Sequence, residues 1–396
     1  MKTLPLQGVR IIAVEQYGAG PYGSMFLADL GAEVIKIENP AIGGDVSRQT
    51  GPFFLGDNDS YFFQTFNLNK KSLTLDLKQA SGRRIFEQLV QSADAVTNNL
   101  RGDQPDKLGL TYQALKQINP KIVCGHLSAY GRDNDRANWP GYDYLMQAEA
   151  GLMSLTGEPG QPPARFGVSM VDFMTGAVAS LGLTAALLGA HRTGQGRDVD
   201  VSLFDVALHQ LSYPATWYLN QGHVTERLPR SAHPATVPCQ LYKTADGFIF
   251  LMAMTDKFWQ VLTDLLAEPK LKQPQFASLA LRREQRDELT RELDAVLSTE
   301  PTAYWLEKLK GHIPCAPVLD LPQALTNPYI RDIGMVRTVP HPQQADMQIL
   351  GCPIKIDGQR MAGKAAGEMG HDTQALLAEL GYSAEQIAAL RAEGAI

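Results

Sequence analysis

The first 130 residues alternate short apolar runs with segments of helical periodicity, and this alternation constrains the fold more than any other feature. Each apolar run is bounded by turn residues, which is typical of a buried strand. Strands are expected at 9–14, 33–37, 73–77, 93–97 and 121–127, and helices at 21–30, 82–92 and 112–118. Strands that alternate with helices predict an α/β fold with a mostly parallel, doubly wound sheet.

The rest of the chain predicts a second domain. The length of 396 residues suggests two or three domains. Helices are expected at 142–156 and 172–192, followed by a strand at 198–202 and a long helix at 203–221. Residues 222–238 are irregular and polar, and we interpret them as a linker. Two apolar runs flank Asp246-Gly247, which predicts a hairpin that opens a smaller α+β domain, with helices at 257–266, 283–298 and 303–310. Two more helices are expected at 372–380 and 383–393.

Composition excludes several classes of partner. The net charge is −6, so no basic footprint indicates a nucleic acid or an anionic membrane. The apolar stretch 173–190 contains Gly, Ser and Thr, which favours a buried core helix over a membrane span. The four cysteines form no Cys-x-x-Cys pair, so we expect no disulfide scaffold and no metal site. With no apolar signal-peptide region at the N-terminus, these features predict a cytoplasmic protein.

A glycine turn raises the question of a nucleotide ligand. Residues 18–23 match G-x-G-x-x-G between a predicted strand and helix, and Glu38 follows at the spacing of a dinucleotide fingerprint. Three readings stay open at this point: an NAD site, a different phosphate-rich ligand at the helix N-terminus, or a tight turn that needs backbone room. Residues 358–364 match G-x-x-x-x-G-K, but Ala365 stands where a P-loop needs Ser or Thr, so we interpret this match as chance.

Motifs further along the chain carry a family resemblance. They are Gly141-Tyr142-Asp143, the segment 151–157, Arg165-Phe166-Gly167, Val171-Asp172 with Thr175-Gly176, and the segments 191–196 and 198–205. Their order resembles the family III CoA-transferases, the CaiB/BaiF family, and the resemblance covers essentially the whole chain. It implies a large Rossmann-like domain from both chain ends (1–221 and 326–396), a linker at 222–238 and a small α+β domain at 239–325. It also implies an interlocked homodimer.

The resemblance also implies a chemistry. Asp172 occupies the position of the family's catalytic aspartate, and Tyr142 and Asp143 stand where the family has active-site residues. Transfer of CoA between carboxylic acids needs a carboxylate that can hold an acyl group, so Asp172 would form an anhydride and then an aspartyl-CoA thioester. This chemistry needs no prosthetic group, and CoA takes part as a substrate. From local sequence alone, Asp172 is equally a helix N-cap, Asp143 another cap, and Tyr142 a packing residue.

The same alignment implies a CoA site near the glycine turn. The implied contacts are Tyr17, Gly18, Ala19, Asn39, Lys71, Asn99, Leu100, Arg101 and Lys107. Formyl-CoA transferases carry a basic residue where Asn39 stands and Gln where Gly18 stands, so this chain departs from that subgroup. Lys and Arg suit the phosphates of CoA, although Lys71, Arg101 and Lys107 read equally well as solvated surface charge.

The substrate is expected to be a dicarboxylate. Residues 233–240 lack the run of glycines that the formyl-CoA/oxalate subgroup has there, and residues 44–48 resemble the members that use dicarboxylates. Both features favour succinyl-CoA as donor and an acceptor such as glutarate or itaconate. Arg48 or Arg165 could bind the distal carboxylate, with help from His233. Three alternatives remain: an α-methylacyl-CoA racemase, which needs a His base where Tyr142 stands, an NAD-dependent oxidoreductase, and a non-catalytic CoA-binding protein.

Overall fold

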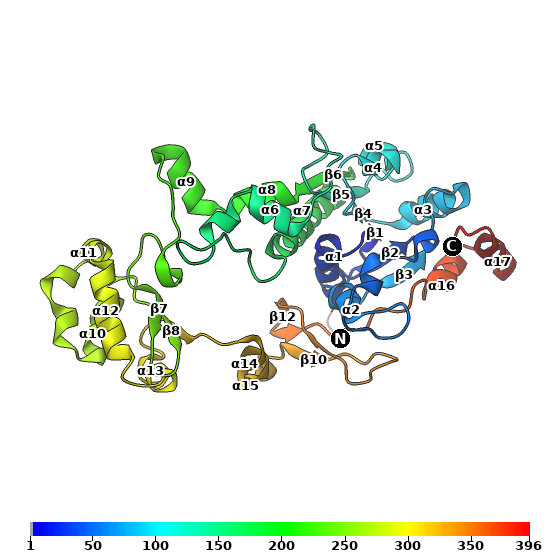
Figure 1. Cartoon of the computed structure of the whole chain (residues 1–396). Coiled ribbons are helices and arrows are strands. Elements are labelled where there is room, and N and C mark those ends of the chain that lie inside the picture. Colours follow the sequence, from blue (N-terminus) through cyan, green and yellow to red (C-terminus); the bar gives the residue numbers. More distant parts are fainter. Residues whose placement is uncertain (1–2) are drawn as a thin grey trace. The chain divides into compact units, whose positions relative to one another are not determined.

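The computed structural model describes residues 3–396, which form two compact units (Figure 1). The larger unit comprises the chain up to Ala150, Gly167–Gln210 and Pro328–Ile396. The smaller unit comprises Gly151–Phe166 and Leu211–Asn327. This division differs from the predicted one, because the segment 151–166 and the residues from 211 to 221 belong to the smaller unit.

A six-stranded sheet forms the centre of the larger unit. Its strand order is β3-β2-β1-β4-β5-β6, and all neighbouring strands are parallel. The strands are β1 (Arg10–Val14), β2 (Glu33–Glu38), β3 (Lys71–Thr74), β4 (Ala95–Asn98), β5 (Val123–Ser128) and β6 (Arg197–Ser202). This is the order of a doubly wound Rossmann sheet, so the predicted α/β class is confirmed. Such sheets bind ligands beyond the carboxyl ends of their strands, where the strand order reverses between β1 and β4.

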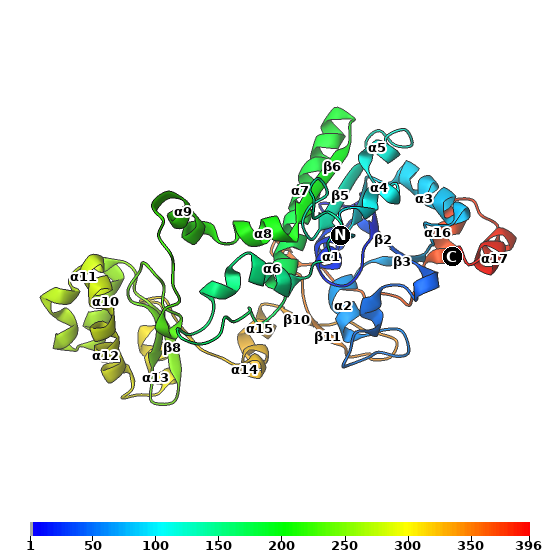
Figure 2. The ribbon, with the colours of Figure 1, turned by 45° about the horizontal axis from the view of Figure 1, so that its top comes forward.

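Helices cover both faces of this sheet because successive strand residues point to opposite sides. Ile11 and Ala13 of β1 face α1 (Ala19–Asp29) and α7 (Met170–Thr193), whereas Ile12 faces the opposite layer. That layer contains α3 (Ala80–Ser92), α16 (Thr373–Glu379) and α17 (Ala384–Ala392). Figures 1 and 2 both place α16 and α17 beside α3 and β3, so the C-terminal segment completes the layer that the N-terminal half begins.

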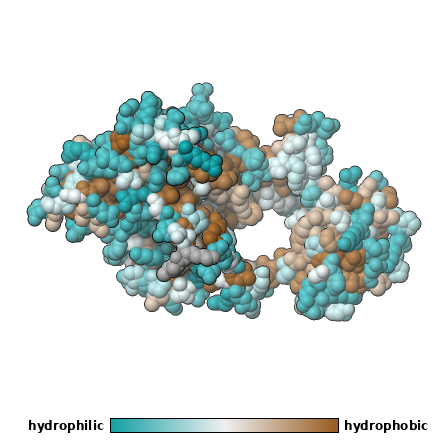
Figure 3. All heavy atoms as spheres, turned by 180° about the vertical axis from the view of Figure 1, so that it is seen from behind, coloured by the Kyte–Doolittle hydropathy of each residue, from teal (hydrophilic) through white to brown (hydrophobic). Residues whose placement is uncertain are grey.

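The long helix α7 is less buried than we expected. It is apolar along its whole length and is, by length and composition alone, able to cross a membrane. Only 28% of its most apolar window is buried, since contacts with α1, β5 and β6 cover one side. The prediction of a core helix therefore holds for that side alone. In the space-filling view, apolar atoms interrupt the hydrophilic surface of the larger unit (Figure 3).

The remaining elements of the larger unit are short. Its helices are α2 (Tyr61–Asn67), α4 (Gln104–Lys107), α5 (Tyr112–Leu115), α6 (Asp143–Glu149), α8 (Leu203–His209) and α15 (Pro328–Asp332). Its small strands are β10 (Val336–Thr338), β11 (Gln348–Leu350), β12 (Lys355–Ile356) and β13 (Gln359–Arg360). The predicted helix 142–156 ends at Glu149, because Gly151 adopts a left-handed φ of 87°.

The smaller unit has an α+β core of its own. Strands β7 (Cys239–Lys243), β8 (Phe248–Met252) and β9 (Cys315–Pro317) form an antiparallel sheet that contains the predicted hairpin. Its helices are α9 (Ser212–Gln221), α10 (Asp256–Leu266), α11 (Leu279–Glu284), α12 (Arg286–Leu297), α13 (Thr302–Leu309) and α14 (Leu321–Thr326). The predicted helix 203–221 is two helices, α8 and α9. Pro214 lies in the first turn of α9, where its missing N–H is tolerated, whereas it would disrupt one continuous helix.

Candidate active site

Asp172 lies in the first turn of α7, and its surroundings make it the best candidate for a reactive group. Ser169 is the N-cap of the helix, so the alternative role of Asp172 as an N-cap is wrong. Burial, and then the negative charge of Asp143, raise the pKa of Asp172 to about 7. A carboxyl group with a pKa near the working pH is typical of functional sites.

Asp143 is held rigidly beside this carboxyl group. It is buried at the start of α6, where its Oδ2 accepts a hydrogen bond of 2.9 Å from the backbone N–H of Asp172. Its Oδ1 accepts a hydrogen bond from Gln147 Nε2 at 2.5 Å. Asp143 therefore contacts the backbone of Asp172 and shapes its electrostatics. Tyr142 precedes Asp143 and is 67% exposed. This exposure does not fit the alternative role of Tyr142 as a packing residue.

The glycine turn lies directly against Asp172. A Cβ atom built on Gly18 would lie 3.3 Å from Asp172 Oδ2. Gly18 is the N-cap of α1, and the first N–H groups of a helix have no partner within it. The turn therefore brings the N-terminus of α1, with Gly18 and Ala19, next to the carboxylate of Asp172.

Close packing of two helices explains this approach. A Cβ on Gly23 would lie 2.5 Å from Gly176 O, and one on Gly176 would lie 2.4 Å from Ala19 O. Only glycine at both positions lets the backbones of α1 and α7 meet at this distance. The G-x-G-x-x-G pattern is therefore at least partly a requirement of packing.

A cavity of about 140 Å³ opens beside the turn, at the carboxyl ends of β1 to β4. Gln16, Asn39, Leu75, Lys78 and Leu100 are among its lining residues. The structure thus brings the predicted CoA residues Asn39 and Leu100 together at one cavity.

The other predicted CoA residues after β4 are Asn99, Arg101 and Lys107, and each is adjacent in sequence to a residue that lines this cavity. Asn99 holds the turn, since its Oδ1 accepts from Gln16 N at 2.9 Å and its Nδ2 donates to Gln16 O at 2.7 Å. Arg101 and Lys107 each form an ion pair with Asp103, at 3.4 and 2.5 Å. Each is a neighbour in sequence of a leucine that lines the cavity, Leu100 or Leu108.

Lys71 lies at the wrong end of the sheet for this site. It is the first residue of β3, and its Nζ pairs with Glu33 at the start of β2 at 2.5 Å. Lys78 instead lines the cavity, and sequence reasoning missed it. The predicted strand 73–77 was displaced toward the C-terminus, whereas β3 ends at Thr74, so the following residues through Lys78 lie at its carboxyl end. Lys71 was assigned from the family alignment, whereas the position of Lys78 directly after the predicted strand was the signal that could have identified it.

Arg48 is not available to bind a substrate, contrary to the expectation from the sequence. Its side chain is fully buried, and its Nε and Nη2 donate to the two oxygens of Glu38, each at 2.7 Å. The same contacts remove the argument for NAD. Glu38, the residue expected to bind the ribose, also accepts from Ser72 Oγ at 2.6 Å and is itself buried.

Arg165 and His233 belong to the smaller unit. Arg165 Nη1 donates to Phe166 O at 2.8 Å. His233 Nδ1 accepts from the backbone N–H groups of Ala235 and Thr236 at 3.0 and 3.1 Å, and its Nε2 contacts Tyr213 Oη at 3.1 Å. Since both ring nitrogens are engaged, His233 shapes its own loop.

Among residues 3–396, no group of three His, Cys, Asp or Glu side chains is arranged to hold a metal ion.

Comparisons with known proteins identify the family of this chain. The family model of CoA-transferase family III matches residues 6–373 of this chain. Succinyl-CoA:glutarate CoA-transferase of Mus musculus is 33% identical over 99% of this chain and 90% of its own. Acetyl-CoA:oxalate CoA-transferase of Acetobacter aceti is 33% identical over 89% of this chain and 90% of its own. A CaiB/BaiF family protein from Brucella suis, 30% identical, has a similar structure with a TM-score of 0.81, covering 96% of this chain and 100% of that chain. The chain therefore belongs to CoA-transferase family III, and it is an enzyme of the CoA-transferase class.

Proposed function

We propose that this enzyme transfers CoA from succinyl-CoA to a small dicarboxylic acid such as glutarate or itaconate, with Asp172 as the nucleophile. The observation that carries the proposal is the position of Asp172: its carboxylate lies against the glycine turn, with a pKa raised to about 7. The dicarboxylate is supported by the relative that acts on succinyl-CoA and glutarate.

The proposed reaction proceeds through two kinds of covalent intermediate. Asp172 attacks the thioester carbonyl, the C–S bond breaks, and a mixed anhydride and CoA thiolate form. The thiolate attacks the aspartyl carbonyl and releases the donor acid, which leaves an aspartyl-CoA thioester. The acceptor carboxylate attacks this thioester, and the thiolate then attacks the acceptor's carbonyl in the new anhydride. These last steps release the new acyl-CoA and regenerate Asp172.

Backbone groups of the turn are suited to assist these steps. Negative charge develops on the carbonyl oxygen at each attack, and fixed N–H donors stabilise such charge. The first turn of α1 presents N–H groups beside Asp172. In this proposal the adenosine part of CoA occupies the cavity lined by Asn39 and Lys78.

Replacing Asp172 tests the proposed nucleophile. The enzyme is incubated with succinyl-CoA and a pool of mono- and dicarboxylic acids, and new acyl-CoA species are identified by mass spectrometry. We expect Asp172→Ala to abolish them, because no other group would accept the acyl chain. The exposed Asp135→Ala is the matched control and should retain activity. New species that persist in Asp172→Ala would show that the nucleophile is wrong.

We further propose that two copies form an interlocked homodimer. Leu181 and Leu188 of α7 are 71% and 52% exposed, and burial of such side chains against a second copy would be favourable. Light scattering after size exclusion should give twice the mass of one chain. A Leu181→Glu variant should shift the protein toward the monomer, and a wild-type mass of one chain would overturn the proposal.

A further inference from the structure

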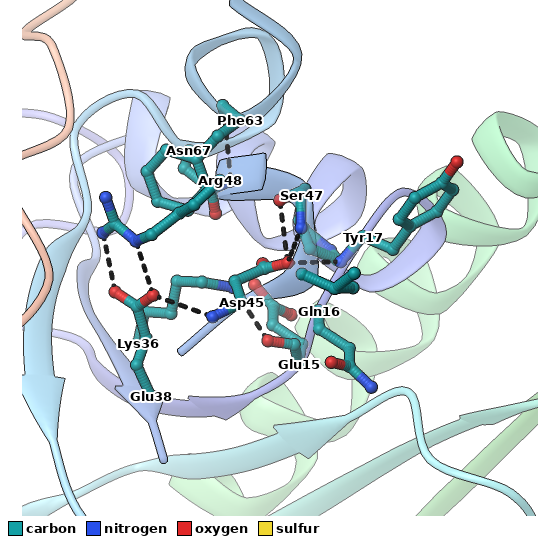
Figure 4. Close-up of polar contacts among 12 residues, drawn as sticks. Glu15, Gln16, Tyr17, Lys36, Glu38, Asp45, Ser47, Arg48, Phe63 and Asn67 are labelled. Atoms are coloured by element: carbon teal, nitrogen blue, oxygen red, sulfur yellow. Dashed lines mark hydrogen bonds and ion pairs between the residues drawn. The ribbon is translucent and has the colours of Figure 1, made fainter. Parts of the chain in front are cut away.

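A cluster of buried charges lies beside the glycine turn (Figure 4). Its centre consists of two ion pairs: Lys36 Nζ with Asp45 Oδ2 at 2.7 Å, and Arg48 with Glu38 at 2.7 Å. The four side chains are at most 1% exposed. Asp45 N also donates to Glu38 Oε2 at 3.1 Å, which joins the two pairs. Such clusters are costly to bury, and apolar residues of similar volume often stabilise a protein as well or better. A requirement for stability alone is therefore a weak explanation of this cluster.

Asp45 connects the cluster to the turn. Its Oδ1 accepts a hydrogen bond of 3.0 Å from the backbone N–H of Tyr17, as Figure 4 shows. The same oxygen accepts from Ser47 N at 2.8 Å and Ser47 Oγ at 2.7 Å. The other partner of Asp45, Lys36, donates to Glu15 O at 2.8 Å, two residues before Tyr17. The two sides of one ion pair thus hold the turn at two backbone atoms.

Tyr17 needs such an anchor. Its φ is 69°, in the left-handed region that side chains other than Gly, Asn and Asp rarely adopt. Residues in this region persist only where surrounding contacts hold them. The next residue is Gly18, where an added Cβ would lie 3.3 Å from Asp172 Oδ2. A change in the backbone at Tyr17 would therefore move the N-terminus of α1 relative to Asp172.

We propose that Asp45 is a positioning residue that holds Tyr17 in its left-handed conformation and so places the N–H groups of the turn for attack by Asp172. This inference rests on the proposed role of Asp172. Asp45 is buried and contacts the reacting atoms only through the turn, so its removal should affect the chemical step more than acyl-CoA binding. Misplacement of a catalytic group by about 1 Å can lower the rate by about 100-fold.

The first test removes the anchor without leaving a buried charge unpaired. In the double variant Lys36→Met/Asp45→Ala, both members of the ion pair are absent. We expect kcat to fall by about 10- to 100-fold while KM for acyl-CoA changes by less than about threefold. Asp45→Asn retains an oxygen that can accept from Tyr17, and its kcat should stay well above that of the double variant. A folded double variant with the wild-type kcat would overturn the proposal.

A change at Tyr17 separates positioning from a general loss of stability. Asn tolerates a positive φ better than Tyr does. In a Tyr17→Asn background, the loss of kcat caused by Lys36→Met/Asp45→Ala should therefore be smaller, and an unchanged loss would overturn the proposal.

If the double variant does not fold, Tyr17→Pro serves instead. Proline removes the N–H and forbids this φ while all four buried charges stay paired, so kcat should fall, and a wild-type kcat would contradict the anchor.

Two controls separate the possible failures. Asp59→Asn removes a buried carboxylate that contacts His341 at 3.1 Å and does not contact the turn. It should lower the melting temperature with kcat unchanged. Asp172→Ala, assayed in parallel, reports on the proposed nucleophile: if it retains transfer activity, the proposed function fails whatever the Asp45 variants show.

Discussion

Asp172 shows how neighbouring residues set the reactivity of one side chain. Its carboxyl group is largely desolvated and lies close to the carboxylate of Asp143, and both effects disfavour the charged form. In its proposed role as the nucleophile, Asp172 must nevertheless be ionised to attack a thioester. The elevated pKa also makes the carboxylate more basic than an ordinary aspartate.

The pH dependence of the rate tests this environment. Because Asp172 must lose its proton and its pKa is about 7, kcat/KM should rise as the pH increases through about 7 and level off above it. Asp143→Asn keeps an oxygen for the backbone N–H of Asp172 but removes the charge. The midpoint should therefore move to lower pH, as stopped-time assays across the pH range would measure. Glu149→Gln, on the same helix, is the control and should leave the midpoint in place, and an unmoved midpoint in Asp143→Asn would contradict the electrostatic role.

At the scale of elements, the crossing of α1 and α7 places the carboxylate of the proposed nucleophile, Asp172. The glycine turn opens α1 and Asp172 opens α7, so the distance between the two helices sets the distance between the turn and the carboxylate. Gly23 and Gly176 make the contact, with each glycine facing the backbone of the other helix. The same crossing covers one face of β1 and β5.

Gly176→Ala tests this contact. The added methyl group would meet Ala19 O at 2.4 Å, so the helices must separate. We expect the free energy of unfolding to fall by about 1–3 kcal/mol, with a larger loss of kcat than of acyl-CoA affinity. Gly189→Ala lies on the same helix with its nearest neighbour at 3.9 Å, and it should be neutral or stabilising by up to about 1 kcal/mol. Urea unfolding and steady-state assays measure the stability and kcat of both variants. Equal values in the two variants would contradict the role of Gly176 in the helix contact.

At the scale of the whole molecule, the last residues complete the core of the larger unit. Ala395 and Ile396 are buried in the cluster that contains Ile12, Phe86 and Leu376. Ala395 O also accepts a hydrogen bond of 2.8 Å from Asp76 N. Asp76 lines the cavity at the strand ends, so the end of the chain supports the proposed CoA site.

Ile396→Ala measures this support. Removing a buried isoleucine side chain should lower the free energy of unfolding by about 2–4 kcal/mol and weaken CoA binding. The neighbouring Glu393 is exposed, and Glu393→Ala should change stability by less than about 0.5 kcal/mol. Urea unfolding and CoA titration calorimetry give both values. A stability of Ile396→Ala equal to that of Glu393→Ala would show that the C-terminal residues are not part of the core.

The sequence predicted the features that depend on residues close together in the chain. Alternating apolar runs indicated the strands and helices, and the parallel sheet follows from their order. The glycine turn was identified from a local motif, Asp172 and Asp143 were implied by the family resemblance, and the structure brings them together. Strand ends were less accurate, since β3 spans Lys71–Thr74 where a strand at 73–77 was expected. Lys78 follows the strand in both versions and lines the cavity, but the family alignment did not indicate it.

Only the tertiary structure decided which charged residues are available to a ligand. Arg48, Lys71 and Lys78 look alike in the sequence, but one is buried against Glu38, one lies at the amino ends of the strands and one lines the cavity. The role of Asp45 was equally invisible, because its partners Tyr17 and Lys36 come from other strands and turns. The physical reason is that periodicity and motifs record local geometry, whereas burial and ion pairing depend on which distant segments meet when the sheet forms.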